Sequence, residues 1–409
     1  MEEKCRSVDT REEEAFAGDG RKFMKHIRIL HSSDLFLDAS FAHLGCDSAC
    51  GNRLRMAQMT VFDRLVARAK AWPADVLCIA GNLFDGMCSS RILLEHVIHG
   101  FEQLAPAQVY IAPGLYDAVA PNSPYAVEVW PQNVVIFQPD TWQSVEHPTL
   151  PLVVHGIGQG KKKDRDFAAP SFDALPRDDQ LHIAVVSEKK DGSVCQSMFA
   201  EHEGPWEGLT YIALGGRAHK AAVETGNNTV AWYPGTPQGR SFDACGSRYA
   251  LEVEIARSAG TASTAVSINA VDMAAILFED LCMDSENSVP LNSLAGDKLP
   301  HDPRERVVHL RLQGKRPLLA EALIQELEKE GKDTFLHMVV SDEMTLDYDR
   351  SILPRANTCL SKLAAAMIAK IMDDPERDAA LFETQALELI LNAHSNKGLA
   401  HDNDMELPE

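Results

Sequence analysis

Apolar residues follow two different periods along the first third of the chain. Short apolar runs at 26–30, 76–80 and 109–112 have the length and composition of buried strands. Between them, 53–71 and 92–104 carry apolar residues three and four positions apart, which predicts amphipathic helices. This alternation of strand and helix predicts a layered α/β core.

The chain then becomes richer in strands. Apolar runs that often end in polar or glycine-rich turns predict strands at 134–137, 152–154, 182–186, 211–214, 229–232 and 249–255. After a polar stretch, the pattern indicates a smaller unit with strands at 307–312 and 335–340. Pro317 suits the first turn of a helix between these two strands, and its apolar face would carry Leu319, Leu323 and Leu327.

These patterns divide the chain into four predicted parts. Residues 1–23 are expected to be a disordered tail, and 24–256 form the main α/β domain. Residues 257–350 form a capping domain with a linker near 283–305, which is rich in Ser, Asn, Pro and Gly. Residues 351–409 form a C-terminal helical segment. Its two helices are predicted at 358–372 and 375–394.

Several features of the sequence favour a cytoplasmic protein with no membrane partner. Residues 1–22 mix acidic and basic side chains and lack the apolar core of a secretory signal. Met24 directly precedes the first predicted strand and is a candidate start codon. No uninterrupted apolar run is long enough to span a bilayer. The nine cysteines, an odd number without a C-x-x-C pair, favour reduced free thiols.

Net charge bears on the class of partner. The formal charge is −21 at pH 7. Nucleic-acid binders need a basic surface that displaces counterions from phosphates, so this charge argues against tight, unaided DNA binding. It leaves room for a local basic groove, because net charge does not report how charges are distributed.

Polar side chains gather in loops that follow the predicted strands, which is where α/β proteins place their functional groups. In chain order these loops read HSSDLFLD at 31–38, GNLFD at 81–85, PGLYD at 113–117, VVS at 185–187, YIALGGRAHK at 211–220 and YPGTPQ at 233–238.

The order and spacing of these motifs, over roughly residues 25–255, resemble the calcineurin-like metallophosphoesterase superfamily. The matching signatures of that superfamily are D-x-H, G-D-x-x-D, G-N-H-D, a lone H, and G-H-x-H. The flanking segments AGNLFD, YIALG and YPGTPQ are similar to those of the SbcD/YhaO-type DNA repair exonuclease branch. The resemblance implies a four-layer αββα sandwich with a small α/β capping domain and C-terminal helices.

A site of the resembled kind holds two divalent cations about 3.5–4 Å apart, which clamp the attacking and leaving oxygens of a phosphodiester. Manganese suits its mixed shell of carboxylate, imidazole and amide ligands. An aspartate bridges the two ions, since its charge offsets their repulsion. A histidine beside the second ion moves a proton or stabilises developing charge on the phosphate.

Most of the side chains that the resemblance assigns to the metals are replaced in this sequence. Phe36 stands at the first His position, and Leu115 and Tyr116 stand at the Asn ligand and the catalytic His. Ser187 falls on the lone His, and Arg217 on the first His of the last motif. A phenyl ring cannot coordinate a cation, a neutral hydroxyl is a poor ligand, and a guanidinium repels a metal.

Three residual ligands remain at the matching positions. Asp34 retains the first carboxylate, and Asn82 stands at the bridging aspartate, where an amide oxygen brings no charge. His219 falls on the second His of the last motif, although that motif carries one residue too many. Each has a simpler interpretation: Asp34 as a turn residue that accepts local N–H groups, and His219 as a surface histidine.

Other polar residues have both structural and functional interpretations. Asp85 and Asp117 match family aspartates outside the metal shell and are expected to fix loops. Arg217 and Lys220 together could form a residual phosphate-binding site. A second set consists of the histidines His31, His155 and His182, predicted to pack or hydrogen-bond, and the basic run 161–165, predicted to be a solvated loop or a phosphate contact.

The favoured function is a degenerate SbcD-like nuclease subunit, catalytically inactive or weak, with a scaffolding role in a DNA repair or processing complex. One alternative is an active metal-dependent phosphodiesterase or exonuclease that uses an altered site around Asp34, Asn82 and His219. Another is a phosphate- or nucleotide-binding module built on Arg217 and Lys220. We expect no cofactor, or manganese or another divalent metal if the protein is active.

The resemblance also implies a partner, because the nucleases of that family bind the coiled coil of an SbcC-like ATPase through a C-terminal helical segment. DNA would be reached through the complex, and a homodimer is compatible with the sequence. Two apolar stripes mark the predicted helices: Leu360, Leu363, Ala364, Met367 and Ile371, then Ala379, Phe382, Ala386, Leu389 and Ala393. These stripes could instead pack on each other or on the capping domain.

Overall fold

The computed structural model describes residues 25–86, 90–139, 141–160, 180–188, 208–225, 228–257, 264–286, 290–291, 302–316, 320–345, 359–373 and 386–387. The predicted tail at 1–23, the basic run at 161–165, Pro317 and nearly all of 374–409 lie outside these ranges. No helix within the described ranges is long and apolar enough to cross a membrane.

The first sheet has six strands in the order β12-β11-β1-β2-β3-β4. Strands β1 to β4 are parallel neighbours, and β11 and β12 extend the sheet in antiparallel fashion. The strand bounds are β1 Lys25–Ser32, β2 Val76–Ala80, β3 Gln108–Ala112, β4 Val134–Ile136, β11 Tyr249–Arg257 and β12 Thr264–Asp272. The predicted strands of this sheet are confirmed within about two residues at each end, a margin usual for element boundaries.

The second sheet also has six strands, in the order β5-β6-β7-β8-β10-β9. Its central strands β6, β7, β8 and β10 are parallel. The strand bounds are β5 Gln143–Glu146, β6 Leu152–Ile157, β7 Leu181–Ser187, β8 Tyr211–Gly215, β9 Ala221–Val223 and β10 Val230–Tyr233. The short edge strands β5 and β9 are too polar or too brief for the apolar pattern to have predicted them.

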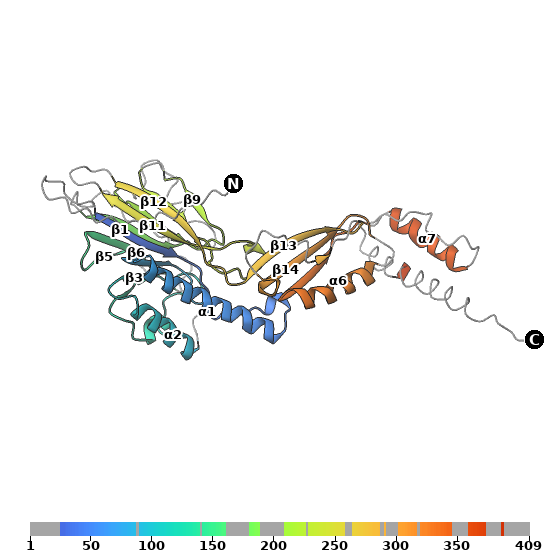
Figure 1. Cartoon of the computed structure of the whole chain (residues 1–409), viewed down its shortest axis with the longest axis horizontal. Helices are drawn as coiled ribbons and strands as arrows, with labels where there is room; N and C mark the ends of the chain where they lie inside the picture. Colours follow the sequence, from blue (N-terminus) through green and yellow to red (C-terminus); the bar gives the residue numbers. More distant parts are fainter. Residues whose placement is uncertain are drawn as a thin grey trace, which may run out of the picture.

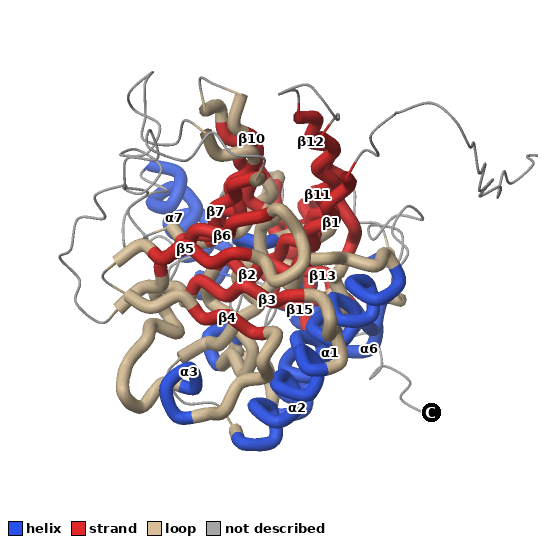
Figure 2. Tube along the Cα trace, turned by 90° about the vertical axis from the view of Figure 1, so that its left-hand side faces the viewer, coloured by secondary structure: helices blue, strands red, loops and turns tan. Residues whose placement is uncertain are grey.

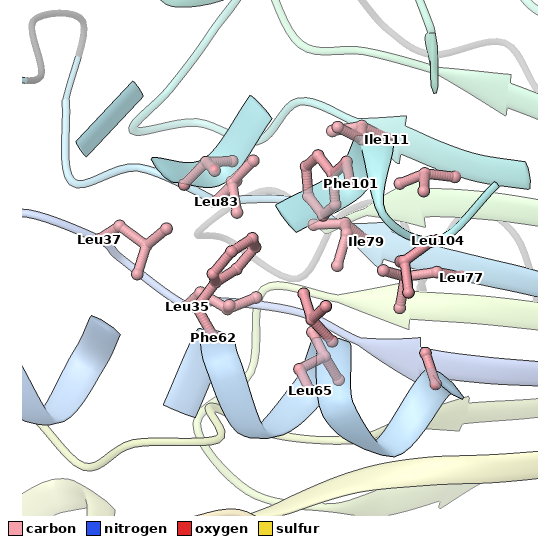
Figure 3. Packing of buried hydrophobic residues seen from close by; sticks show 14 of the residues in the cluster. Leu35, Leu37, Phe62, Leu65, Leu77, Ile79, Leu83, Phe101, Leu104 and Ile111 are labelled. Atoms are coloured by element: carbon pink, nitrogen blue, oxygen red, sulfur yellow. The ribbon is translucent and has the colours of Figure 1, made fainter. Parts of the chain in front are cut away.

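Alternating side chains divide the first sheet between two cores, because successive residues of a strand point to opposite faces. Val76, Cys78 and Ala80 face the second sheet, where they pack in one cluster with side chains such as Ile183 and Tyr211. Leu77 and Ile79 face the other way, into a cluster with the helices, which Figure 3 shows from close by. The two sheets therefore pack face to face, with a helical layer on the first.

Helices α1 (Ser48–Ala71) and α2 (Arg91–Glu102) form that layer, on one side of β2 and β3 (Figure 2). Asp47 caps α1 by accepting the Cys50 N–H, and Ser90 caps α2 by accepting the Leu93 N–H. Phe62 and Leu65 of α1 meet Phe101 of α2 in the cluster against the sheet. The shorter helices are η1 Ala42–Leu44, α3 Pro124–Val127, η3 Phe242–Ala244 and η4 Pro303–Glu305.

A third sheet forms the small unit beyond the sandwich (Figure 1). Its strands β13 (Leu277–Asp284), β14 (Arg306–Gln313) and β15 (His337–Asp342) are parallel. Helix α6 (Ala320–Thr334) packs on it through Leu327 and Ala320. This unit adheres to the sandwich through a shared apolar cluster that includes Leu44, Phe278 and Val307, and through a 2.9 Å hydrogen bond from His337 Nε2 to Leu44 O.

The structure moves two predicted boundaries. The main domain does not end at residue 256, because β12 pairs with β11 along its whole length and belongs to the first sheet. The linker predicted near 283–305 begins later, since Met283 and Asp284 still belong to β13. Within the C-terminal segment, α7 (Cys359–Asp373) is confirmed, but Leu363 of its predicted apolar stripe is half-exposed, whereas Ala364 and Ile368 are buried.

The fold class is as predicted: an α/β sandwich of two sheets, with a small α/β unit attached. The segments that connect β6 to β7 and β7 to β8 lie largely outside the described ranges, so only the helical layer on the first sheet is described. The carboxyl ends of the parallel strands of both sheets carry the predicted functional loops.

Candidate functional site

The loops after β1 and β2 are held in an unusual backbone conformation. Asp34, Phe36 and Asn82 have φ of 56°, 48° and 51°, in the left-handed region that non-glycine residues seldom adopt. Two hydrogen bonds fasten these loops to each other: Asp34 N donates to Gly81 O and Phe36 N to Asn82 O, both at 2.9 Å. Such strain is typical of positions where side chains are aimed at a site.

The two sheets come close together directly beneath these loops. A Cβ atom added to Gly215, the last residue of β8, would lie 1.6 Å from Ala80 O at the end of β2. A Cβ on Gly81 would lie 2.1 Å from the Ser187 Oγ at the end of β7. Glycine is therefore required at both positions, and Ser187 is buried against backbone rather than open to the cavity.

The Asp34 carboxylate is buried and fully engaged by protein donors. Its Oδ1 accepts the Asn82 Nδ2–H at 2.7 Å. Its Oδ2 accepts the Ser33 hydroxyl at 2.7 Å and the Gly216 N–H at 2.8 Å. Burial raises the pKa of Asp34 to about 6, and these three hydrogen bonds act against that rise by favouring the charged form.

Asn82 is oriented by contacts on both ends of its amide. The nitrogen faces Asp34, and Oδ1 accepts the Tyr116 N–H at 3.1 Å. The amide oxygen, which is the atom that could bind a metal, is therefore turned toward a backbone donor. Tyr116 and Leu115 have 46% and 40% of their surface exposed, so they form the rim of the site rather than its floor.

Asp117 joins the loop after β2, its own loop after β3 and helix α3. Its Oδ1 accepts the Gly114 N–H at 2.7 Å and the Asn82 N–H at 3.2 Å. Its Oδ2 accepts the Leu83 N–H at 2.7 Å and the Tyr125 hydroxyl at 2.5 Å. Burial raises the pKa of Asp117, and its hydrogen bonds oppose that rise. The prediction that Asp117 fixes loops is confirmed.

A buried glutamate and an arginine line the same cavity as Asp34. Glu188 Oε2 accepts the Arg217 Nε–H at 2.8 Å and the Tyr233 hydroxyl at 2.6 Å, and the Glu188 side chain is only 2% exposed. The Arg217 guanidinium also lies over the Tyr233 ring, 4.5 Å from its centroid. Arg217 is thus paired with a carboxylate that the motif comparison did not include.

A second arginine covers the Phe36 ring. Arg240 lies 3.6 Å above the centroid of Phe36 and forms a 2.6 Å ion pair with Asp85. The Tyr116 ring meets Phe36 edge-on, with centroids 5.2 Å apart. Asp85 accordingly fixes a loop side chain, as predicted.

These residues line one cavity of about 260 Å³, called here the site cavity. Its lining includes Asp34, Phe36, Asn82, Leu115, Tyr116, Glu188, Arg217 and Arg240. His219 and Lys220 do not line it. They lie in a neighbouring pocket of about 180 Å³ with Arg248 and Tyr249, which we call the Lys220 pocket.

The structure therefore separates two sets of residues that the sequence had grouped. His219 does not join Asp34 and Asn82: its Nε2 lies 2.7 Å from Asp243 O, and it faces the Lys220 pocket. Arg217 and Lys220 do not form one anion site, because Arg217 turns to Glu188 while Lys220 lies 4.2 Å over the Tyr249 ring.

The donor set does not fit a pair of divalent cations. Both oxygens of Asp34 face N–H or O–H donors, and Asn82 presents its amide nitrogen to that carboxylate. Within the described ranges, no group of three or more His, Cys, Asp or Glu side chains is arranged to hold a metal. The Arg217 and Arg240 guanidinium groups of the lining pair with Glu188 and Asp85, so these charges are balanced within the protein.

Sequence reasoning missed Glu188, Tyr233 and Arg240. A signal was present for Glu188, since it directly follows the apolar strand β7 and a buried acid at such a strand end needs a partner. Tyr233 opens the YPGTPQ motif, and Arg240 lies two residues beyond it. Neither contact could be read from spacing, because each crosses between loops of different strands.

The predicted structural histidines are confirmed. His31 is buried with Nδ1 2.8 Å from the Tyr211 hydroxyl, and burial lowers its pKa to about 3. His155 Nε2 lies 3.0 Å from His182 Nδ1, and burial lowers the pKa of His155 to about 4. Neither group lines the site cavity.

Comparison with known proteins gives a structural likeness without a family match. No protein-family profile matches the chain, and no curated protein matches it. Among solved structures it is similar to the crystal structure of TT1561 of Thermus thermophilus. That similarity has 13% sequence identity and a TM-score of 0.32, and it covers 59% of this chain and 99% of the other. Function is therefore inferred from the site itself.

Proposed function

We propose that this protein is a degenerate, SbcD-like metallophosphoesterase homologue that does not hydrolyse phosphodiesters and serves as a scaffold in a DNA-processing complex. The observation that carries the proposal is that protein donors satisfy both carboxylate oxygens of Asp34. Its carboxylate oxygens accept hydrogen bonds from Ser33, Asn82 and Gly216. In a two-metal site that carboxylate would instead face a cation.

Protein side chains supply the hydrogen bonds and charge that bound metals would otherwise supply to the carboxylates. The Asn82 amide satisfies one oxygen of Asp34, and the Arg217 guanidinium neutralises the buried Glu188. Phe36, packed against Arg240 and Tyr116, fills the position of the first metal-binding histidine with an apolar ring. A site stabilised in this way does not depend on bound ions, which supports a structural rather than a catalytic role.

Among the described residues, an imidazole is also missing from the lining of the cavity. Tyr116 stands where the resembled family has its catalytic histidine, so a phenol stands in place of the imidazole. His219, the imidazole that an altered active site would need, lies in the neighbouring Lys220 pocket. These placements weigh against the alternative of a working phosphodiesterase with an altered metal site.

The scaffolding role requires a partner, and we propose a coiled-coil ATPase of the SbcC kind, docked through the C-terminal segment. Helix α7 lies beyond the third sheet, far from the sandwich (Figure 1). Leu363 exposes 49% of its surface there, while Ala364 and Ile368 are buried. The second predicted helix lies almost wholly outside the described ranges. Location in the cytoplasm, and DNA contact through the complex, belong to the same proposal.

Deleting residues 374–409 tests the partner proposal. The shortened chain should retain its circular dichroism spectrum and lose co-purification with the ATPase from the native host. A shortened chain that unfolds would assign the segment to the core. One that folds and keeps the ATPase would refute docking through this segment.

A nuclease assay tests the loss of catalysis. Single- and double-stranded DNA incubated with the purified protein and manganese should remain intact. The matched control is Asp34→Ala, which removes the carboxylate that accepts the Asn82 amide. Cleavage by the wild-type protein that disappears in Asp34→Ala would overturn the proposal. Cleavage that persists in the variant would indicate a contaminating nuclease, and a more highly purified preparation must then leave DNA intact.

A further inference from the structure

The Lys220 pocket lies beside the site cavity, and Ala218 and Thr236 line both. Its cationic side chains are Lys220 and Arg248, with His219 next to them. Among the described residues, no aspartate or glutamate lines it. In a chain with a formal charge of −21, a hollow lined by cations without a carboxylate is a local exception that requires explanation.

Arg248 supplies the second observation, because it is a buried charge without an ionic partner among the described residues. Only 6% of its surface is exposed. Its donors go to neutral groups: Nη1 to Ala218 O at 2.8 Å, Nη2 to Cys245 O, and Nε to Gly246 O at 3.3 Å. Asp272 acts on it only through longer-range charge.

A buried cation without a counter-ion is costly, and proteins usually pair such groups. Burial lowers the pKa of Arg248, as expected where desolvation outweighs nearby negative charge. An anion in the adjoining pocket would relieve this cost. Each guanidinium nitrogen of the Nη pair carries two hydrogens, so donors remain after the carbonyl contacts are counted.

Lys220 is placed to complete the pocket. Its ammonium lies 4.2 Å over the Tyr249 ring, and this contact orients the side chain. An aromatic face takes no N–H hydrogen bond of full strength, so the ammonium donors can still serve a ligand. His219 Nδ1 lies 3.5 Å from Arg248 Nη2, and its Nε2 lies 2.7 Å from Asp243 O, so both ring nitrogens face protein groups. Ser247 adds a hydroxyl to the lining. The volume of about 180 Å³ admits a small ion, not a large cofactor.

We infer that the Lys220 pocket binds a small tetrahedral oxyanion, either free phosphate or the terminal phosphate of a phosphate ester. Lys220 and Arg248 provide the charge, and Ser247 provides a neutral donor. Charge-assisted hydrogen bonds of this kind are the strong contacts in phosphate recognition. The inference does not depend on the proposed scaffold function, because the Asp34, Asn82 and Glu188 side chains of the site cavity take no part in it.

Calorimetric titration of the full-length protein with inorganic phosphate, in a low-salt chloride buffer, tests the inference. The wild-type protein should bind one phosphate per chain, and binding should weaken as sodium chloride is added. Lys220→Met should weaken binding at least about tenfold, since a hydrogen bond to a charged group is worth roughly that factor. Lys220→Arg should retain binding.

Two control variants locate the site. Lys332→Met removes an exposed lysine of α6 and should leave phosphate binding unchanged. Arg217→Met alters the site cavity and should also leave it unchanged. Absence of phosphate binding to the wild-type protein, or equal binding to wild type and Lys220→Met, would overturn the inference. Binding lost in Arg217→Met but not in Lys220→Met would move the anion to the site cavity and overturn it too.

Adenosine monophosphate and adenosine distinguish the two sources of the anion. Tighter binding of the monophosphate than of phosphate, with none of adenosine, would support a phosphate ester. Equal binding of monophosphate and phosphate would support the free ion. Binding of adenosine as strongly as its monophosphate would contradict recognition through the phosphate group.

Discussion

The Asn82 amide nitrogen donates a 2.7 Å hydrogen bond to Asp34 Oδ1. The amide nitrogen of Asn82 therefore decides the charge of this pair of side chains. An aspartate at residue 82 would bring two carboxylates into contact and would need a cation between them. An asparagine makes the pair self-sufficient.

Replacing Asn82 with Asp should therefore destabilise the protein. At pH 7.5 we expect Asn82→Asp to lower the free energy of unfolding by about 3 kcal/mol, because two buried like charges would meet without a counter-ion. The loss should shrink near pH 5, where one of the two carboxyls is protonated. Urea denaturation at both pH values measures this. A variant as stable as wild type at pH 7.5 would contradict the account.

The sequence predicted the secondary structure of this region better than it predicted the contacts between its side chains. Strand β2 was predicted at its observed bounds, since five apolar residues between polar loops allow little else. That Phe36 and Tyr116 carry no imidazole was also visible, because it depends on residue type alone. The Asn82–Asp34 bond was not, since the direction in which an amide points is decided by neighbours such as the Tyr116 N–H.

Replacing the Asp117 carboxylate should lower the free energy of unfolding more than removing any single hydrogen bond to it. Asp117→Asn replaces one acceptor oxygen with an N–H group that faces backbone donors, so we expect a loss of about 3 kcal/mol in the free energy of unfolding. Tyr125→Phe is the matched control and deletes one hydrogen bond, for a loss of about 1 kcal/mol. Equal losses for the two variants in urea denaturation would show that Asp117 does not join the loops.

The domain boundary and the edge strands show a second limit of sequence reasoning. Strand β12 alternates apolar and polar residues over 266–270, although no strand was predicted in this segment. Its partner, however, is β11, and nothing in the alternation says whether the strand joins the sandwich or the capping unit. Which strands pair is decided by the tertiary fold and not by the local pattern. The sequence therefore placed the domain boundary at 256, before β12.

Stability should fall in mild acid because of His31. Its pKa is lowered by burial to about 3 in the folded protein, against an ordinary value of 6.5, so the unfolded chain binds the proton first. The contribution to stability is complete above pH 6.5 and is lost as pH falls toward 3. Between pH 6 and 5 the loss approaches about 1.4 kcal/mol per pH unit.

The variant His31→Asn isolates this contribution from that of the His155 and His182 pair. Urea midpoints measured from pH 7.5 to 4.5 should fall less steeply for His31→Asn than for wild type. Parallel curves for the two proteins would show that His31 is not the group that titrates.

The Arg217 and Glu188 pair should behave as a coupled unit. Arg217→Met leaves Glu188 buried without its cation, and we expect a loss of about 2 kcal/mol after allowing for the exposed half of the guanidinium. Glu188→Gln removes the charge but retains an acceptor for the Tyr233 hydroxyl. The double variant should therefore be more stable than the sum of the single losses predicts. Additive losses would show that the ion pair does not stabilise the site.

Protein donors satisfy both carboxylate oxygens of Asp34, and we propose that the site cavity holds no pair of metal ions. Metal content tests this most directly: the protein is dialysed against buffer with manganese, then against metal-free buffer, and bound metal is counted by inductively coupled plasma mass spectrometry. The account predicts less than one manganese ion per chain, with no change in Asp34→Ala. Two tightly held ions per wild-type chain, lost in Asp34→Ala, would contradict it.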